Sequence, residues 1–245
     1  MQTDKEWFSE WFDSPYYHIL YKNRDDREAE LFLSNLVEHL ALNKEQLLVD
    51  LACGKGRHSI YLNKLGFNVV GVDLASCSIA AAKKFENDRL HFEVCDLRNL
   101  PFVQKFDVAL NLFTSFGYFD CNETNKQVLH QISKCLKPEG LLVIDFMNVH
   151  TVLKNLIPFQ QKVEEGITFD ISKRVDHGLI IKRIDFSDAG KSYSFQEEVQ
   201  VLTLQNFEEL LHESNFSIKQ VFGNYQLQPY QEQSSDRVII VAQKL

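Results

Sequence analysis

Length, composition and charge exclude several classes of protein. A chain of 245 residues with 44% hydrophobic residues can bury one sizeable core, with room for an appended lobe. The formal net charge of -8, without any Lys/Arg run longer than two residues, argues against a nucleic-acid surface. Five cysteines without paired spacing favour a reducing compartment, and no apolar run forms a signal peptide or approaches membrane-spanning length. We therefore expect a soluble, cytoplasmic protein that binds neither nucleic acid nor membranes.

The first 150 residues alternate between helical and strand patterns. Apolar residues at three- and four-residue steps between Ala29 and Leu40 predict an amphipathic helix. Further helices are expected near 57–65, 76–86 and 122–136, and strands at 47–53, 68–74, 90–96, 106–113 and 140–148. Strands joined through helices imply right-handed crossovers. The expected fold class is therefore α/β, with a doubly wound, seven-stranded, mostly parallel sheet covered by helices on both faces.

The pattern changes after Val149. Short strands are expected at 160–173, 178–186 and 192–204, separated by the hairpin turn signals Asp176-His177-Gly178 and Asp188-Ala189-Gly190. A helix near 205–214 and an antiparallel pair of strands, 216–225 and 237–245, then complete the large sheet. We thus expect an α/β domain formed by residues 1–150 and 205–245, with an antiparallel β insertion at 151–204.

The segment from Asp50 to Gly56 reads Asp-Leu-Ala-Cys-Gly-Lys-Gly, a strand that runs into a glycine turn and then a helix. Such a turn indicates either a nucleotide-type site or an ordinary tight strand-to-helix connection. Two acids downstream favour the site. Asp73, at the end of the second strand, can accept hydrogen bonds from two ribose hydroxyls, and Asp96, at the end of the third, can accept from an adenine amino group. Together they fit an adenosine.

At these residues the chain resembles the class I S-adenosylmethionine-dependent methyltransferases, over about residues 15–150. Their motif of an acid, small residues and Gly-x-Gly matches Asp50 to Gly56. The resemblance implies a Rossmann-like fold and S-adenosylmethionine as the cofactor, with the glycine loop around its methionine part. From the glycine loop to the end of the fourth strand, the cofactor-binding residues that it implies are Asp50, Ala52, Gly54, Gly56, Asp73, Leu74, Asp96, Leu97, Asn111, Leu112 and Ser115.

The amino-terminal segment is similar to that of glycine N-methyltransferase-like enzymes, in which a tyrosine and an arginine close over the cofactor. Tyr21 and Arg27 are the matching residues, and the resemblance implies that Arg27 binds the methionine carboxylate through its guanidinium fork. Arg27 could instead be a solvated partner of Asp25 or Glu30. Trp7 and Trp11, with the phenylalanines that follow each, form one apolar stripe. That stripe predicts either a helix packed on the domain or a flap that shields the reaction from water.

Residues 111–119 resemble the segment of that family beside the transferred methyl group. We expect Phe113 to be buried, and Asn111, Ser115 and Tyr118 to face the site, where aromatic faces attract the cationic sulfonium. The predicted insertion would lie above these strand ends as a lid and select the acceptor.

The predicted reaction is transfer of a methyl group to a small molecule through nitrogen or oxygen. An amine that enters deprotonated needs only positioning, whereas a hydroxyl needs a base, for which Tyr17, Tyr118 and His150 are the catalytic candidates. His58 is expected to pack or to meet solvent, and no cluster has metal-ligand spacing, so we predict no metal. The chain could be a monomer or a homodimer.

Two other classes share part of this pattern. A dinucleotide oxidoreductase that uses NAD(P) would have a third glycine or an alanine where Ser59 stands. A non-catalytic S-adenosylmethionine-binding protein could keep the same fold and the same loop, because fold does not fix function.

Overall fold

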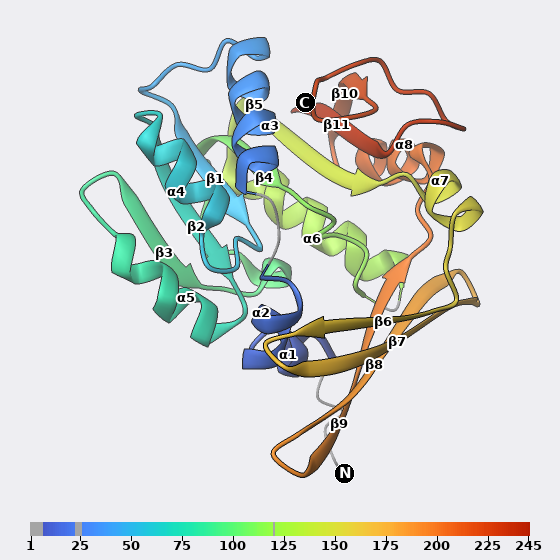
Figure 1. Cartoon of the computed structure of the whole chain (residues 1–245). Helices are drawn as coiled ribbons and strands as arrows, with labels where there is room; N and C mark the ends of the chain where they lie inside the picture. The colour runs from blue at the N-terminus through green and yellow to red at the C-terminus, as the bar shows by residue number, and fades with distance from the viewer. Residues whose placement is uncertain (1–6, 23–25, 120) are drawn as a thin grey trace.

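The computed structural model describes residues 7–22, 26–119 and 121–245. These residues form a seven-stranded sheet in the order β10-β11-β5-β4-β1-β2-β3 and a separate four-stranded sheet (Figure 1). In the large sheet, neighbouring strands are parallel except where β11 pairs antiparallel with β5 and β10. Its strands are β1 (Leu47–Leu51), β2 (Asn68–Asp73), β3 (Leu90–Val94), β4 (Phe106–Asn111), β5 (Leu136–Met147), β10 (Phe216–Phe222) and β11 (Arg237–Lys244).

Helices cover both faces of the large sheet, because its central strands β1 and β4 are buried over almost their whole length and need apolar cover on each side. One face packs against α3 (Asp26–His39), α4 (Arg57–Lys64) and α5 (Ser76–Ala82). The other packs against α6 (Asn122–Cys135) and α8 (Leu204–Glu213). Two 3₁₀ turns, η1 (Lys83–Phe85) and η2 (Leu97–Asn99), follow α5 and β3. The predicted doubly wound α/β fold is confirmed.

The second sheet is antiparallel and corresponds to the predicted insertion. Its order is β6-β7-β8-β9, and the four strands are β6 (Phe159–Glu164), β7 (Ile167–Asp176), β8 (Leu179–Asp188) and β9 (Lys191–Gln200). Both predicted hairpin turns are present. The single strand expected at 160–173 was wrong, because Glu165 and Gly166 adopt positive φ values of 50° and 81° and turn the chain between two strands. The short helix α7 (Val149–Lys154), which links the sheets, was not predicted.

The amino-terminal segment connects the two sheets through α1 (Trp7–Trp11) and α2 (Pro15–Leu20). On one side, Trp11 and Leu20 are buried in a cluster with apolar residues of β7 and β8. On the other side, Asp13 accepts a hydrogen bond of 2.7 Å from the backbone N–H of Cys77 at the start of α5. The segment is therefore held by the insertion and by the α/β domain at once, as Figure 1 shows for α1 and α2.

Candidate active site

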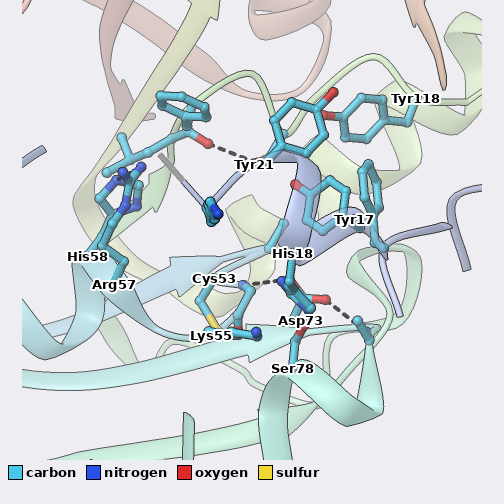
Figure 2. Close-up of a pocket in the computed structure, with 18 residues that line it drawn as sticks. Tyr17, His18, Tyr21, Cys53, Lys55, Arg57, His58, Asp73, Ser78 and Tyr118 are labelled. Carbon is cyan, nitrogen blue, oxygen red and sulfur yellow. Dashed lines mark hydrogen bonds between the residues drawn. The ribbon is translucent and has the colours of Figure 1, made fainter. Parts of the chain in front are cut away.

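A cavity of about 370 Å³ lies at the carboxyl ends of β1, β2 and β4 (Figure 2). This is the switch point of the sheet, where the chain leaves β1 toward β2 on one side and β4 lies on the other, and where ligands of such sheets bind. The described residues that line it are Phe12, Tyr17, His18, Tyr21, Lys22, Ala52, Cys53, Gly54, Lys55, Arg57, His58, Asp73, Ala75, Ser78, Leu112, Phe113, Ser115 and Tyr118.

The glycine loop forms the floor of the cavity, and its two glycines differ in function. Gly54 has a φ of 57°, and a Cβ built on it would meet no atom within 4 Å, so its backbone faces open space. Gly56 has a φ of 81°, and its Cβ would lie 2.5 Å from the Phe92 ring. Gly56 is therefore required for packing beneath the loop, and only Gly54 presents backbone to the cavity. Ala52, with a φ of 58°, also lines the cavity.

Asp73 supports the loop from the end of β2. Its carboxylate accepts hydrogen bonds of 2.7 Å from the backbone N–H of Gly54 and 2.8 Å from that of Ala75. Burial raises the pKa of Asp73, and these backbone N–H groups oppose the rise. Asp73 lines the cavity, so one carboxylate both fixes the turn and faces the cavity, and its contact with ribose stays a prediction.

Asp50 lies below the loop rather than in the cavity lining. It is 1% exposed and accepts a 2.6 Å hydrogen bond from the Ser59 hydroxyl. Burial, with the negative charge of Asp73 added to it, raises the pKa of Asp50 to about 7, although the Ser59 hydroxyl acts in the opposite direction. Burial also raises the pKa of the neighbouring Cys53 thiol, so we expect this thiol to be unreactive.

Three residues predicted to bind the cofactor lie outside the described lining of the cavity: Leu74, Asp96 and Leu97. Asp96 caps η2 and binds Arg98, whose Nη2 atom is 2.6 Å from the Asp96 carboxylate. Burial raises the pKa of Asp96, but the hydrogen bonds and the charge of Arg98 lower it by more, so the group stays ionised. Leu74 is 38% exposed, and Leu97 packs against the core next to α6.

The upper side of the cavity is formed by the amino-terminal segment through Phe12, Tyr17, His18, Tyr21 and Lys22, which we call the roof. The insertion holds the roof from behind. Glu197 of β9 accepts hydrogen bonds of 2.7 Å from the Trp11 indole and 2.6 Å from the Tyr21 hydroxyl. Lys182 of β8 also contacts that hydroxyl and lies 3.3 Å from Glu197. None of the described residues of 151–204 lines the cavity, so the insertion acts on it through the roof.

The residues after β4 that line the cavity, Leu112, Phe113, Ser115 and Tyr118, form its wall. This wall differs in detail from the prediction. Phe113 is only half-buried and lines the cavity, so the expectation of a buried Phe113 was wrong. Left-handed φ values of 61° at both Phe113 and Thr114 turn the chain here, and Phe116 enters the core instead. Ser115 and Tyr118 do line the cavity. Asn111 is buried and donates hydrogen bonds of 3.3 Å to the carbonyls of Leu51 and Ser115, which holds the loop from below.

Lys55, Arg57 and His58, within and directly after the glycine loop, also line the cavity. Sequence reasoning missed Lys55 and Arg57, and it expected His58 only to pack or to meet solvent. Arg57 and His58, at the start of α4, lie on one side of the cavity, with the tyrosines Tyr17, Tyr21 and Tyr118 on the other (Figure 2). The Arg57 guanidinium lies 5.1 Å from the centre of the Phe113 ring. Lys55 lies between the two glycines of the loop. Their position within and directly after the Gly-x-Gly turn was a usable signal, because the first turn of the following helix points at the ligand space.

Two predicted residues are placed elsewhere. His150 is in α7, not among the described residues that line the cavity, and its Nε2 atom lies 3.2 Å from the Glu232 carboxylate. The geometry therefore gives it no path to an acceptor in this cavity. Arg27 is exposed in the first turn of α3 and is also outside the described lining.

The groups that line the cavity fit S-adenosylmethionine. A cavity of this size is typical of a small-molecule site. It offers exposed loop backbone at Gly54, a carboxylate at Asp73 for ribose hydroxyls, and aromatic faces for a sulfonium cation. Within the described ranges, no group of three His, Cys, Asp or Glu side chains is arranged to hold a metal ion, and no helix is long and apolar enough to cross a membrane. Fold and site together define a class I methyltransferase.

The comparisons with known proteins agree with that class. Residues 48–140 match a family model described as a methyltransferase domain. The chain is 29% identical over 232 residues to the glycine/sarcosine N-methyltransferase of Aphanothece halophytica, which covers 90% of this chain and 83% of the relative. Its fold is similar to an S-adenosylmethionine-dependent methyltransferase from Clostridium acetobutylicum, with a TM-score of 0.79, 19% identity and coverage of 94% and 96% of the two chains.

A second structural neighbour was solved with the cofactor bound. It is an amino pentose methyltransferase from Micromonospora echinaspora, with a TM-score of 0.68, 20% identity and coverage of 95% of this chain and 98% of the neighbour. This protein is a class I S-adenosylmethionine-dependent methyltransferase that acts on a small molecule, and S-adenosylmethionine is its cofactor.

Proposed function

We propose that the enzyme methylates the amine nitrogen of a small molecule and that both substrates bind in the cavity at the ends of β1, β2 and β4. The observation that carries the proposal is the set of tyrosine contacts opposite the glycine loop. The Tyr21 hydroxyl donates to Glu197, and the Tyr118 hydroxyl donates to the carbonyl of Thr114. These hydroxyls are directed toward protein acceptors, which suits an amine that enters deprotonated better than a hydroxyl that must lose a proton.

The relatives support a nitrogen acceptor. The name of the relative from Aphanothece halophytica states methylation of glycine and sarcosine, and that of the neighbour from Micromonospora echinaspora states an amino pentose. We extend to this chain only the chemistry these names share, a primary or secondary amine on a small polar molecule. Tyr17 and Tyr118, which were candidates for a base, would then position the acceptor.

The side chains of this protein would carry out binding, orientation and exclusion of water. When bound, S-adenosylmethionine supplies a methyl group activated by a sulfonium. Asp73 would accept from the ribose hydroxyls, and the backbone of Gly54 would contact the methionine part. Phe113 and the tyrosines would face the cation, and the roof would keep water from the reacting atoms. Holding the acceptor in line with the methyl group is worth about 7–11 kcal/mol of barrier in oriented systems, so positioning alone is an adequate source of catalysis.

Several finer assignments belong to the same proposal. Ala52, Leu112 and Ser115 would contact the cofactor from the loops after β1 and β4. We also assign contacts with the cofactor to Arg27, Leu74, Asp96 and Leu97, which lie outside the described lining of the cavity. The five cysteines are all free, which agrees with a cytoplasmic enzyme. We further propose that residues 151–204 form a lid that selects the acceptor through the roof, in a monomer or homodimer that binds neither nucleic acid nor membrane.

Calorimetry tests the cofactor assignment. We expect S-adenosylmethionine and its demethylated product to bind the wild type, and NAD not to bind. Asp73→Ala should weaken both by about 10- to 100-fold, because hydrogen bonds to a charged group are each worth about 1.5–3 kcal/mol. Asp107→Asn is the matched control, since Asp107 also accepts a backbone N–H, from Leu47 at 2.8 Å, but at the opposite end of the sheet. Unchanged binding in Asp73→Ala would place the cofactor elsewhere.

Turnover with paired acceptors tests the chemistry. Glycine, sarcosine and a nucleotide-linked amino sugar would each be assayed beside the analogue that carries a hydroxyl in place of the amine. We expect product only from amines. Methylation of a hydroxyl analogue at a comparable rate would reject the nitrogen assignment while leaving the class of enzyme intact.

A further inference from the structure

Asp145 is a buried carboxylate behind the cavity wall. It lies near the carboxyl end of β5, is 1% exposed, and is not among the described residues that line the cavity. Its Oδ2 atom accepts hydrogen bonds of 2.8 Å from the backbone N–H of Phe113 and 3.1 Å from the Tyr225 hydroxyl. Its backbone carbonyl accepts from the N–H of Thr114 at 2.9 Å. One residue therefore binds two consecutive backbone N–H groups of the wall.

Arg237 completes the group from β11. Its Nε atom donates to Oδ1 of Asp145 at 2.7 Å, and its Nη2 atom donates to the Thr114 hydroxyl at 2.9 Å. Its guanidinium lies 5.9 Å from the centre of the Phe113 ring. Burial and the charge of Asp145 raise the pKa of Tyr225, so this phenol stays a hydrogen-bond donor. Hydrogen bonds thus connect the wall to β5 through Asp145 and to β11 through Arg237, and Tyr225, after β10, binds Asp145 in turn.

The backbone held by this group is one that its residues disfavour. Phe113 and Thr114 both have a φ of 61°, in the left-handed region. Non-glycine residues seldom adopt that region, and for a β-branched residue such as threonine it is a true outlier. Two such residues in succession persist only where the surroundings impose them, and strain of this kind gathers at functional sites. Asp145 and Arg237 supply the hydrogen bonds that impose it.

We propose that Asp145 is a positioning residue for methyl transfer, which with Arg237 and Tyr225 holds the Phe113–Thr114 turn left-handed and so directs Phe113 into the cavity. The inference rests on the proposed function in one respect, that the cofactor binds in this cavity. It predicts that loss of the Asp145 carboxylate weakens cofactor binding without any direct contact being removed, because the turn relaxes and Leu112, Phe113 and Ser115 leave their places.

The test measures the affinity for S-adenosylmethionine by calorimetry, with no acceptor present. We expect Asp145→Asn to bind about tenfold more weakly than the wild type, with Asp107→Asn again as the control at the other end of the sheet. Adding Thr114→Gly to Asp145→Asn should restore part of the affinity, since glycine adopts a φ near 60° without strain. A general loss of fold stability in Asp145→Asn would not be rescued in this way, because Thr114→Gly relieves only the strain of the turn.

A second pair of variants decides the matter if Asp145→Asn does not fold. Thr114→Val and Thr114→Gly both lose the hydroxyl that Arg237 binds, but only valine keeps the β-branch that disfavours the turn. We expect valine to bind the cofactor severalfold more weakly than glycine. Equal affinity of the two, or an Asp145→Asn variant that binds like the wild type, would overturn the inference. Unchanged binding in Asp73→Ala would instead overturn the cavity assignment itself.

Discussion

Asp50 couples the stability of the fold to pH. Burial and the charge of Asp73 raise its pKa from the ordinary 3.8 to about 7. Between these two values the folded protein keeps a proton that the unfolded chain has released. The contribution of Asp50 to the free energy of unfolding therefore falls as the pH rises from about 4 to about 7, and this contribution levels off above that range.

We predict that Asp50→Asn flattens this decline, because asparagine still accepts from Ser59 but carries no titrating group. Urea unfolding between pH 4 and pH 8, without cofactor, would show the variant gaining stability relative to the wild type as the pH rises. A difference between the two proteins that stays constant with pH would contradict the assignment of the raised pKa to Asp50.

Alanine in place of each loop glycine should separate packing from ligand contact. Gly56→Ala places a Cβ 2.5 Å from the buried Phe92 ring at a φ of 81°, so we expect a loss of about 2–4 kcal/mol in the free energy of unfolding. Gly54→Ala meets no atom and carries only backbone strain of about 1–2 kcal/mol, but its methyl group would enter the cavity. We expect Gly54→Ala to show the greater loss of cofactor affinity, measured by calorimetry beside thermal unfolding.

For single residues, positions set by the local backbone were predicted better than the directions in which side chains point. Asp73, Gly54 and Ala52 follow from the order strand, turn, helix, which is local. Phe113 was misplaced because its direction depends on Asp145 and Arg237, which are distant in the chain. His150 was placed near the site from its position after a strand, but α7 carries it toward Glu232.

The amino-terminal helices and the insertion form one structural unit above the cavity. Glu197 binds Trp11, Tyr21 and Lys182, and Asp188 accepts a 2.8 Å hydrogen bond from the Tyr16 hydroxyl. The roof is therefore set by contacts between α1, α2 and the strands β8 and β9.

We predict that Glu197→Ala loosens the roof. It leaves the Trp11 indole and Lys182 without their shared acceptor in a half-buried position, a loss of about 1–3 kcal/mol. Hydrogen exchange should rise in residues 7–22, and cofactor affinity should fall, while the core strands keep their protection. Glu198→Ala, on the opposite face of β9, is the matched control. Faster exchange spread evenly over the whole protein would argue against a local role.

The elements of the α/β domain were predicted within a few residues, because alternating buried strands and amphipathic helices have distinct periods. The insertion was harder. Its β6–β7 hairpin turns on Glu165-Gly166, a weaker signal than the Asp-containing turns that were recognised. The helix α7 has six residues, too few for a periodic pattern to be visible.

At the scale of the molecule, the cavity depends on a segment outside the α/β core. The two core clusters around the large sheet contain no described residue of the first 22, whereas the cluster behind the roof contains Trp11 and Leu20. We predict that removing residues 1–22 leaves the helix and strand content, seen by circular dichroism, nearly unchanged and abolishes detectable cofactor binding. Wild-type affinity in the truncated protein would show that the roof is dispensable.

The overall fold could be predicted because strands and helices alternate regularly along the chain, and the cofactor because its motif lies in one contiguous stretch between β1 and β3. The roof could not be assigned to its partners, since it is defined by contacts across the whole length of the chain. The residues that Glu197 joins are 186 and 176 positions away from it.

That separation has a consequence during synthesis. The ribosome makes Trp11 and Tyr21 first, but the strand that carries Glu197 emerges only after the complete large-sheet segment up to β5 has appeared. For most of translation these side chains lack Glu197, the acceptor that joins them, while the strands that form the floor of the cavity can already pair. We therefore expect the apolar surface of the amino-terminal segment to be a point where a nascent chain is open to aggregation or to chaperones, and we expect the active site to close late in folding.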